Sequence, residues 1–200
     1  HSFGTTIGRK TLASGQELVV IAPRNYNYMT EWLSNFDVGT SGDHAGFSEA
    51  ADLVVDRFNQ YVSERDLADY KVWVVGYSRG GAVIDLFAKK VNADINSYKM
   101  SPEDFYVYTF GAPRASVTET KYANIHDVKD GNDLLLGVYN QLTTEYMDAS
   151  FTADKYLNKE MLLTQLSDAV EQNTLNYNVV IVVDTLFDMD VETFRSIKNV

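Results

Sequence analysis

The sequence predicts an α/β fold with a mostly parallel central sheet and crossover helices. Apolar segments of strand length, at residues 17–22, 71–75 and 105–110, alternate with longer segments that have the spacing of amphipathic helices, at residues 48–64 and 82–90. Such alternation is typical of parallel sheets, because parallel neighbours need a crossover connection between them. A Gly-x-Ser-x-Gly sequence lies directly between one of these strands and its helix, and it is the third observation that favours this fold class.

Composition limits the class of protein. The chain has 28 acidic and 17 basic residues and a formal net charge of −11, which argues against nucleic acid and against electrostatic docking on an anionic membrane. No apolar run has the length of a membrane span, and no cysteine is present for disulfides or thiolate metal sites. Without repeats or linkers, residues 1–200 are expected to form a single domain that is truncated at both ends. The start at His1, without an initiator Met, indicates the truncation at the N-terminus.

The N-terminal part is expected to begin with a hairpin. Residues 3–7 and 17–22 are strand-like and are joined around Ala13-Ser-Gly15. Apolar residues between positions 28 and 36 then fall on one helical stripe, and a polar loop follows at residues 39–43. This stripe predicts a short helix that faces the core.

Two long helices are expected in the middle of the chain. Residues 48–64 form an amphipathic pattern, with Ser48 as the expected N-cap. Residues 82–90 form a second such pattern directly after the Gly-x-Ser-x-Gly sequence. Further along, we expect strands at residues 105–110 and 122–128.

The C-terminal third carries a weaker signal. Residues 153–173 have the apolar spacing of a helix, and residues 179–183 form a short apolar run of strand length.

The segment Gly76-Tyr-Ser-Arg-Gly80 is predicted to be a nucleophile elbow. Such a turn holds its serine, here Ser78, at strained backbone angles, so the hydroxyl stands out from the sheet edge above a helix N-terminus that favours negative charge. Gly76 and Gly80 are expected because a Cβ at either position would collide with the tight crossover.

A serine nucleophile needs a base, usually histidine, and an acid that orients the base. In this class of sheet the acid follows a later strand, and Asp133 has that position, in the turn after residues 122–128. Asp127, within the strand, and Asp130, at the start of the turn, are competitors. All three carboxylates are equally consistent with a solvated surface turn.

The histidine is missing from its expected place. His1, His44 and His126 all precede Asp133, whereas the base should follow the acid. For His44 we expect a structural role, and for His126 packing within a strand. Three interpretations are open: a base beyond Val200, a hydrolase that has lost its base, or an unusual arrangement of one of these three histidines.

Four motifs in the same order resemble the class 3, fungal-type lipase family and its bacterial relatives. Residues 76–82 resemble the family's elbow, and Tyr108-Thr-Phe-Gly-Ala-Pro-Arg114 resembles its Thr-Phe-Gly-x-Pro-Arg signature. His44-Ala-Gly-Phe47 is similar to its His-x-Gly-Phe, and residues 124–134 resemble the strand and loop that carry its catalytic Asp. The spacing of Arg24 and Trp32 is also similar, and the likeness runs from Phe3 to Leu136.

The resemblance implies an α/β-hydrolase fold and a serine ester hydrolase of the lipase or carboxylesterase type. Ser78 would be the nucleophile, Asp133 the acid, and the backbone N–H groups of Tyr26 and Arg79 the oxyanion hole. Asn25 and Tyr26 stand where the family usually has Gly and a small hydroxyl residue. No metal or organic cofactor is implied. The substrate would be an acyl ester or lipid, and secretion is the default suggested by bacterial members.

The resemblance also places residues 26–38 in the family's lid region, which would make transient contact with a lipid interface. The other interpretation of the same residues is an ordinary core-facing helix or loop. A second hypothesis for the whole chain is a non-catalytic hydrolase-like module that binds a ligand or partner, because no histidine follows Asp133.

Overall fold

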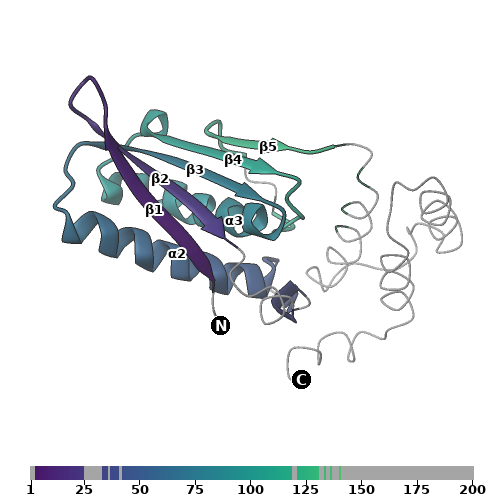
Figure 1. Cartoon of the computed structure of the whole chain (residues 1–200). Coiled ribbons are helices and arrows are strands. Elements are labelled where there is room, and N and C mark those ends of the chain that lie inside the picture. The colour runs from purple at the N-terminus through teal and green to yellow at the C-terminus, as the bar shows by residue number, and fades with distance from the viewer. Residues whose placement is uncertain are drawn as a thin grey trace, which may run out of the picture.

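The computed structural model describes residues 3–24, 33–35, 37–40, 42–118, 121–130, 133, 136 and 140. Its central feature is a sheet of five strands that lie side by side in the order of the chain (Figure 1). The strands are β1 (Gly4–Thr11), β2 (Glu17–Arg24), β3 (Tyr70–Tyr77), β4 (Phe105–Phe110) and β5 (Ile125–Val128). Only the pair β1 and β2 is antiparallel, so the predicted mostly parallel α/β fold is confirmed.

The antiparallel pair is the predicted hairpin. Its turn is closed by bonds from Leu12 N–H to the Gln16 carbonyl (2.8 Å) and from Gly15 N–H to the Leu12 carbonyl (3.0 Å). Gly15 has a φ of 88°, which a residue without a Cβ adopts at little cost. β1 runs on to Thr11, beyond the predicted end at residue 7, because its polar second half still pairs with β2.

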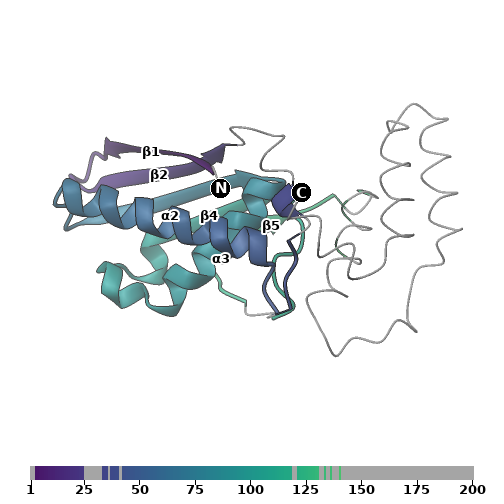
Figure 2. The ribbon, with the colours of Figure 1, turned by 90° about the horizontal axis from the view of Figure 1, so that it is seen from below.

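Both long helices, α2 (Ala45–Glu64) and α3 (Arg79–Ala93), lie on the same face of the sheet, as Figure 2 shows from below. Between them and the sheet, four phenylalanines are fully buried: Phe47, Phe58, Phe87 and Phe105. Phe87 meets the rings of both Phe58 (5.9 Å) and Phe105 (6.1 Å) edge-on. Each buried side chain of this size contributes about 2 kcal/mol from burial alone, so this layer holds the helices on the sheet.

The start of α2 differs from the sequence prediction. The helix begins at Ala45, and its N-cap is His44 rather than Ser48, so that prediction was wrong. The His44 imidazole accepts a hydrogen bond from the Phe47 N–H (3.4 Å), and the Ser48 N–H already donates to the His44 carbonyl (2.9 Å). Ser48 therefore lies inside the first turn of α2, past the N-terminal position where a cap would act.

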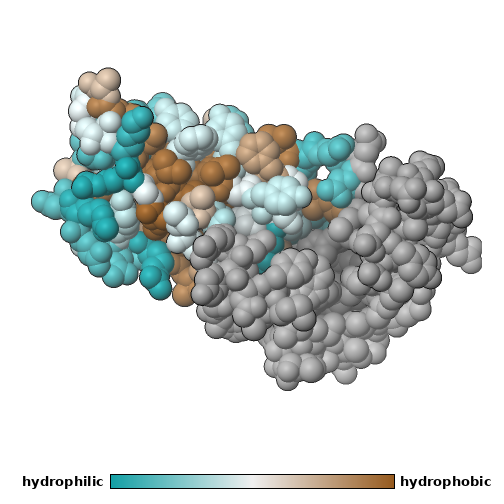
Figure 3. Space-filling view, in the orientation of Figure 1, coloured by the Kyte–Doolittle hydropathy of each residue, from teal (hydrophilic) through white to brown (hydrophobic). Residues whose placement is uncertain are grey.

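The opposite face of the sheet carries exposed apolar side chains. Aromatic residues of β3 and β4 lie beside one another there, in the register pairs Trp73 with Tyr106 and Tyr77 with Phe110. Tyr77 is 74% exposed, and Val128 on β5 continues the last row. Figure 3 shows apolar residues gathered over the strands on this side. Among the described elements, both long helices cover only the other face.

Several predicted elements are shorter than expected or lie outside the described residues. β5 covers only residues 125–128 of the predicted strand at 122–128, because a turn from Tyr122 to Ile125 occupies its start. Of the apolar stripe at 28–36, only the 3-10 turn η1 (Leu33–Asn35) is described. The predicted helix 153–173 and strand 179–183 lie outside the described residues. Two further 3-10 turns, η2 (Ile95–Tyr98) and η3 (Pro102–Asp104), precede β4.

Among the helices described, none is both long enough and apolar enough to cross a membrane.

Candidate active site

Ser78 is the single residue between β3, which ends at Tyr77, and α3, which begins at Arg79. Its backbone has φ 52° and ψ −129°, a conformation that residues with a Cβ rarely adopt. Two hydrogen bonds hold it there: Ser78 N–H donates to the Phe110 carbonyl (2.9 Å), and the Ser78 carbonyl accepts from Ala82 N–H (3.1 Å). The side chain is partly exposed and makes no capping bond to α3. The predicted elbow geometry is therefore present.

Glycines allow β3 and α3 to approach their neighbours closely at the elbow. A Cβ on Gly76 would lie 2.7 Å from Ile84 Cδ1 and 2.8 Å from the Gly80 carbonyl oxygen, as the crossover argument predicts. Gly80 differs from the prediction: its Cβ would meet Pro23 Cγ at 3.2 Å, a tight contact with the end of β2 rather than with the crossover. The second severe contact belongs to Gly81, whose Cβ would lie 2.8 Å from Ala112 Cβ.

Arg79 begins α3, so its N–H is one of the helix N-terminal donors that point away from the helix. Its side chain is buried, at 9% exposure, and donates from Nη2 to Ser34 Oγ (2.6 Å). The guanidinium carbon lies 5.2 Å from the centre of the Phe3 ring and 5.9 Å from that of Phe47. The Arg79 side chain thereby connects the elbow to η1, to Phe3 and to α2. Tyr26, the second predicted oxyanion donor, lies outside the described residues.

Replacing Arg79 separates the role of its side chain from that of its backbone N–H. Arg79→Leu keeps the N–H but removes the charged hydrogen bond to Ser34, which is worth about 2 kcal/mol. We expect a loss of stability of that size in urea unfolding, with ester turnover within about threefold of wild type. Lys90→Leu, on the same helix but outside the elbow, is the matched control. A fall in turnover without loss of stability would contradict this division of roles.

Asp133 follows β5 in the chain, and the carboxyl end of β5 lies at the sheet edge where Ser78 also lies. Backbone hydrogen bonds connect the ends of β3, β4 and β5 along this edge. The Phe110 carbonyl accepts from Ser78 N–H, and the next residue, Gly111, donates to the Val128 carbonyl (2.8 Å). Asp133 N–H donates to the Asp130 carbonyl (3.2 Å), and its Oδ1 accepts from Leu136 N–H (2.9 Å). The carboxylate therefore caps a turn and is held in a defined direction.

The competing acid Asp127 is engaged elsewhere. It accepts a hydrogen bond from Thr109 Oγ1 (2.6 Å) and forms an ion pair with Lys129 (2.6 Å), on the side of the sheet that faces α3. Asp130 offers its carbonyl to the turn.

His44 is fully buried, and both of its ring nitrogens are used. Nδ1 accepts from Phe47 N–H, so Nε2 carries the proton and donates to the Asn35 carbonyl (3.0 Å), while the ring stacks on Phe47. Burial lowers the pKa of His44 to about 4; the bond to Asn35 and the nearby Asp37 oppose this shift, and Arg79 adds to it. His44 is therefore a neutral structural residue, as expected.

Protonation of His44 should make stability depend on pH. The unfolded chain binds the proton near pH 6.5 and the folded chain only near pH 4, so stability is complete above pH 6.5 and falls as the pH drops through this window. The loss from this residue is about 3 kcal/mol at pH 4. His44→Asn keeps an N-cap acceptor but does not titrate. We expect the stability difference between wild type and His44→Asn, measured by urea unfolding, to shrink by this amount from pH 7 to pH 4. A constant difference would contradict the assignment.

His126 lies exposed on β5 and stacks on Tyr108, with ring centres 4.7 Å apart. It packs against the neighbouring strand, as expected, on the face opposite α3. His1 lies outside the described residues.

Two features of the site were missed in the sequence. The buried Arg79 side chain follows Ser78, and its only signal was a charged residue at the second variable position of the Gly-x-Ser-x-Gly sequence. The capping role of His44 had little signal, because the imidazole directly precedes an apolar helical pattern but histidine is not among the common N-caps.

Comparison with known proteins identifies a family and several similar solved structures. The family described as lipase (class 3) matches residues 20–145. Among solved structures, the chain is similar to the lipase from Rhizopus microsporus var. chinensis, with 26% identity and a TM-score of 0.39 over 56% of this chain and 41% of that one. It is also similar to a fungal lipase–inhibitor complex (24% identity, TM-score 0.37, 56% and 49% covered) and to the Rhizomucor miehei lipase–propeptide complex (24%, 0.32, 56% and 42%).

The chain spans less than half the length of each of these three proteins. No curated protein matches it significantly in sequence.

Proposed function

The chain belongs to the class 3 lipase family, whose fold is that of the α/β-hydrolases, and from this premise we propose that it is a serine ester hydrolase that works through an acyl-enzyme on Ser78. The observation that carries the proposal is the backbone of Ser78, held at φ 52° between β3 and α3. Strained backbone conformations of this kind are concentrated at functional sites.

The reaction is acyl transfer in two steps. Ser78 Oγ attacks the carbonyl carbon of an acyl ester while a base takes its proton, and the ester C–O bond then breaks so that the alcohol leaves with that proton. Water attacks the acyl-enzyme in the second step and releases the carboxylic acid. The lipid or short-chain ester reacts without a metal or organic cofactor in this scheme.

The developing oxyanion would be bound by the N–H groups of Arg79 and Tyr26. The position of Arg79 at the N-terminus of α3 supports its part, since helix N-termini favour negative charge. One such donor contributes about 3 kcal/mol to transition-state stabilisation.

Asp133 is proposed as the acid that orients the base, because it follows β5, whose carboxyl end lies at the same sheet edge as Ser78, and because its carboxylate accepts a hydrogen bond from Leu136 N–H. Neither described histidine serves as the base in this proposal: His44 is buried with both nitrogens bonded, and His126 lies within β5. We place the base beyond Val200, where the order serine, acid, histidine would put it.

A fluorophosphonate probe tests the proposal directly. It should form a covalent adduct with the protein read from the complete gene, and tryptic mass spectrometry should locate the adduct on Ser78. The second candidate function, a non-catalytic binding module, is favoured by the positions of His44 and His126. It predicts no adduct and no histidine in the gene soon after residue 200.

A further inference from the structure

A row of three exposed apolar side chains lies along the sheet edge that carries Ser78. Tyr77, Phe110 and Val128 are the last residues of β3, β4 and β5, and they are register partners across the three strands. Their exposed fractions are 74%, 40% and 49%. Neighbouring strands lie about 4.8 Å apart, so this edge row is about 10 Å long. It is an apolar surface at the same edge as the proposed nucleophile.

The edge row lies on the face of the sheet opposite α3. Along β3, Val72 is fully buried whereas Trp73 and Tyr77 are exposed, as the alternation of side chains along a strand requires. The burial of β4 alternates in the same way and exposes Phe110. The proposed oxyanion donor, Arg79 N–H, begins α3, which covers the other face. The edge therefore offers a hydrogen-bond donor on the α3 side and an apolar surface on the opposite side.

The backbone hydrogen bonds that hold Ser78 also hold the edge row. Ser78 N–H donates to the Phe110 carbonyl (2.9 Å), and Gly111 N–H donates to the Val128 carbonyl (2.8 Å). Gly111 has a φ of 52°, and a Cβ at this position would lie 3.6 Å from Tyr77 Cε2. The Tyr77 ring therefore extends along the edge to the bend that follows β4, and the row has a fixed position relative to Ser78.

An ester bound at Ser78 has a polar carbonyl group and an apolar chain attached to it. Under the proposed function, the carbonyl oxygen accepts hydrogen bonds at the N-terminus of α3. A chain that extends from the carbonyl toward the opposite face of the sheet meets Tyr77 first, because this residue directly precedes Ser78. Each methylene group that the ring removes from water adds to binding, and contiguous exposed apolar surface is typical of ligand-binding grooves.

We propose that Tyr77 is a specificity-determining residue that binds the apolar chain of the ester, in its acyl or its alcohol part. This inference rests on the proposed function of Ser78. Phe110 and Val128 extend the surface beyond the Tyr77 ring, so a longer chain gains contact over the length of the edge row, about 10 Å, and no further. Binding of the chain in the transition state raises kcat/KM for long-chain esters and leaves kcat/KM for acetyl esters nearly unchanged.

The test compares kcat/KM for nitrophenyl octanoate and nitrophenyl acetate, with the protein read from the complete gene and each substrate below its micelle concentration. Tyr77→Ser should lower the octanoate/acetate ratio by at least about tenfold, because it removes the ring that binds the chain. Turnover of the acetate should stay within about threefold of wild type. Tyr77→Phe should keep the wild-type ratio, since the ring and not the hydroxyl contacts the chain.

Tyr106→Ser is the matched control. Tyr106 is also a tyrosine on the face opposite α3, with 38% of its surface exposed, but it lies near the start of β4, at the other end of the strand from Phe110. Its octanoate/acetate ratio should stay within about twofold of wild type.

A second pair of substrates, octyl acetate and ethyl acetate, separates the two parts of the ester. If Tyr77→Ser lowers only the octanoate/acetate ratio of the nitrophenyl esters, the acyl chain lies on the edge row. If it lowers only the octyl/ethyl ratio, the alcohol chain lies there, and a loss of both ratios shows that the row accepts either chain. Two unchanged ratios would overturn the inference, as would an equal loss in Tyr106→Ser or in Tyr77→Phe.

Ser78→Ala distinguishes a failure of this inference from a failure of the proposed function. Turnover that depends on Ser78, with both ratios unchanged in Tyr77→Ser, overturns this inference alone. Wild-type protein that is inactive on all of these esters, or equally active as Ser78→Ala, overturns the proposed function and this inference with it. Circular dichroism melting shows whether each variant folds. If Tyr77→Ser melts early, Tyr77→Thr replaces it, because a β-branched residue is better suited to a strand.

Discussion

Ser78→Ala is expected to lower ester turnover by at least about 10⁴-fold, because in the proposed mechanism the Ser78 hydroxyl forms the acyl-enzyme. The measurement is kcat/KM on short-chain nitrophenyl esters, with the protein read from the complete gene. Thermal stability should change little, because the bonds that hold the elbow come from the backbone of residue 78 and the strain at φ 52° is the same for alanine.

Ser63→Ala is the matched control for this variant, since Ser63 is exposed on α2. It should keep wild-type activity and melting temperature. Wild-type turnover in Ser78→Ala would remove Ser78 from the mechanism, whereas inactivity of the wild type itself would favour the binding module.

Gly46→Ala is expected to give the largest loss of stability, about 4 kcal/mol. A Cβ at this position would lie 2.2 Å from the carbonyl oxygen of Ser34, so the backbone of η1 would have to move. Two contacts resist that movement: Gly46 N–H donates to the Asp37 carbonyl (2.8 Å), and Arg79 donates to Ser34 Oγ. In a chain of this size the loss corresponds to a decrease in Tm of about 10 °C.

Gly8→Ala provides the control, because no atom lies within 4 Å of a Cβ at this position on β1. We expect a change in Tm of no more than about 2 °C for that variant. Differential scanning calorimetry of both variants measures the effect. A Gly46→Ala protein as stable as wild type would show that η1 moves without cost, and would contradict the close packing described around Arg79.

The elbow could be predicted from the sequence because its determinants are local. An apolar strand, two glycines, a serine and an amphipathic helix follow one another within about 20 residues, and the backbone angles of Ser78 follow from that order. The alternation of strands and helices likewise determined the parallel sheet, because a parallel crossover is needed between each pair.

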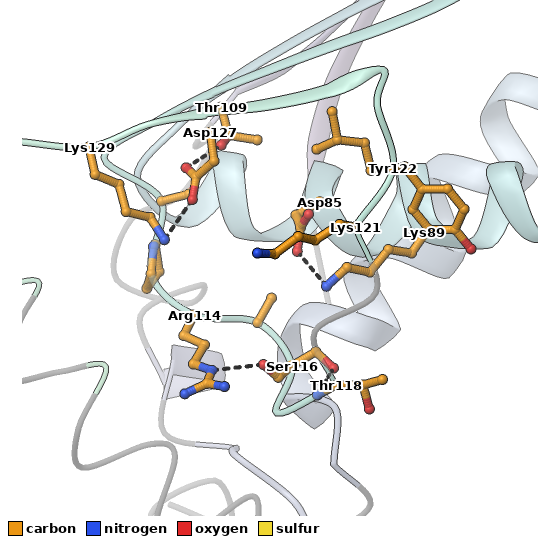
Figure 4. A pocket seen from close by; sticks show the side chains of 14 residues that line it. Asp85, Lys89, Thr109, Arg114, Ser116, Thr118, Lys121, Tyr122, Asp127 and Lys129 are labelled. Atoms are coloured by element: carbon orange, nitrogen blue, oxygen red, sulfur yellow. Dashed lines mark hydrogen bonds and ion pairs between the residues drawn. The ribbon is translucent and has the colours of Figure 1, made fainter. Parts of the chain in front are cut away.

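Features that depend on tertiary burial could not be predicted in the same way. Charged residues such as Arg79 are usually exposed, so its burial against Phe3 and Phe47 depends on packing between distant segments. Histidine is not among the common N-caps, and His44 serves as one only because its buried ring stays neutral. The cavity lined by α3 and by the loops around β4 and β5 is likewise assembled from segments that lie far apart in the sequence (Figure 4).

The consecutive order of the strands has a consequence for synthesis on the ribosome. Each of the five described strands pairs with the one made just before it, so none of these five waits for a distant partner, and this part of the sheet can form in the order of synthesis as the polypeptide emerges. β3 is added to a finished hairpin, and it keeps an open edge until β4 is translated. Since Ser78 N–H bonds to the last residue of β4, the strained conformation of Ser78 is completed only after Phe110 has left the exit tunnel.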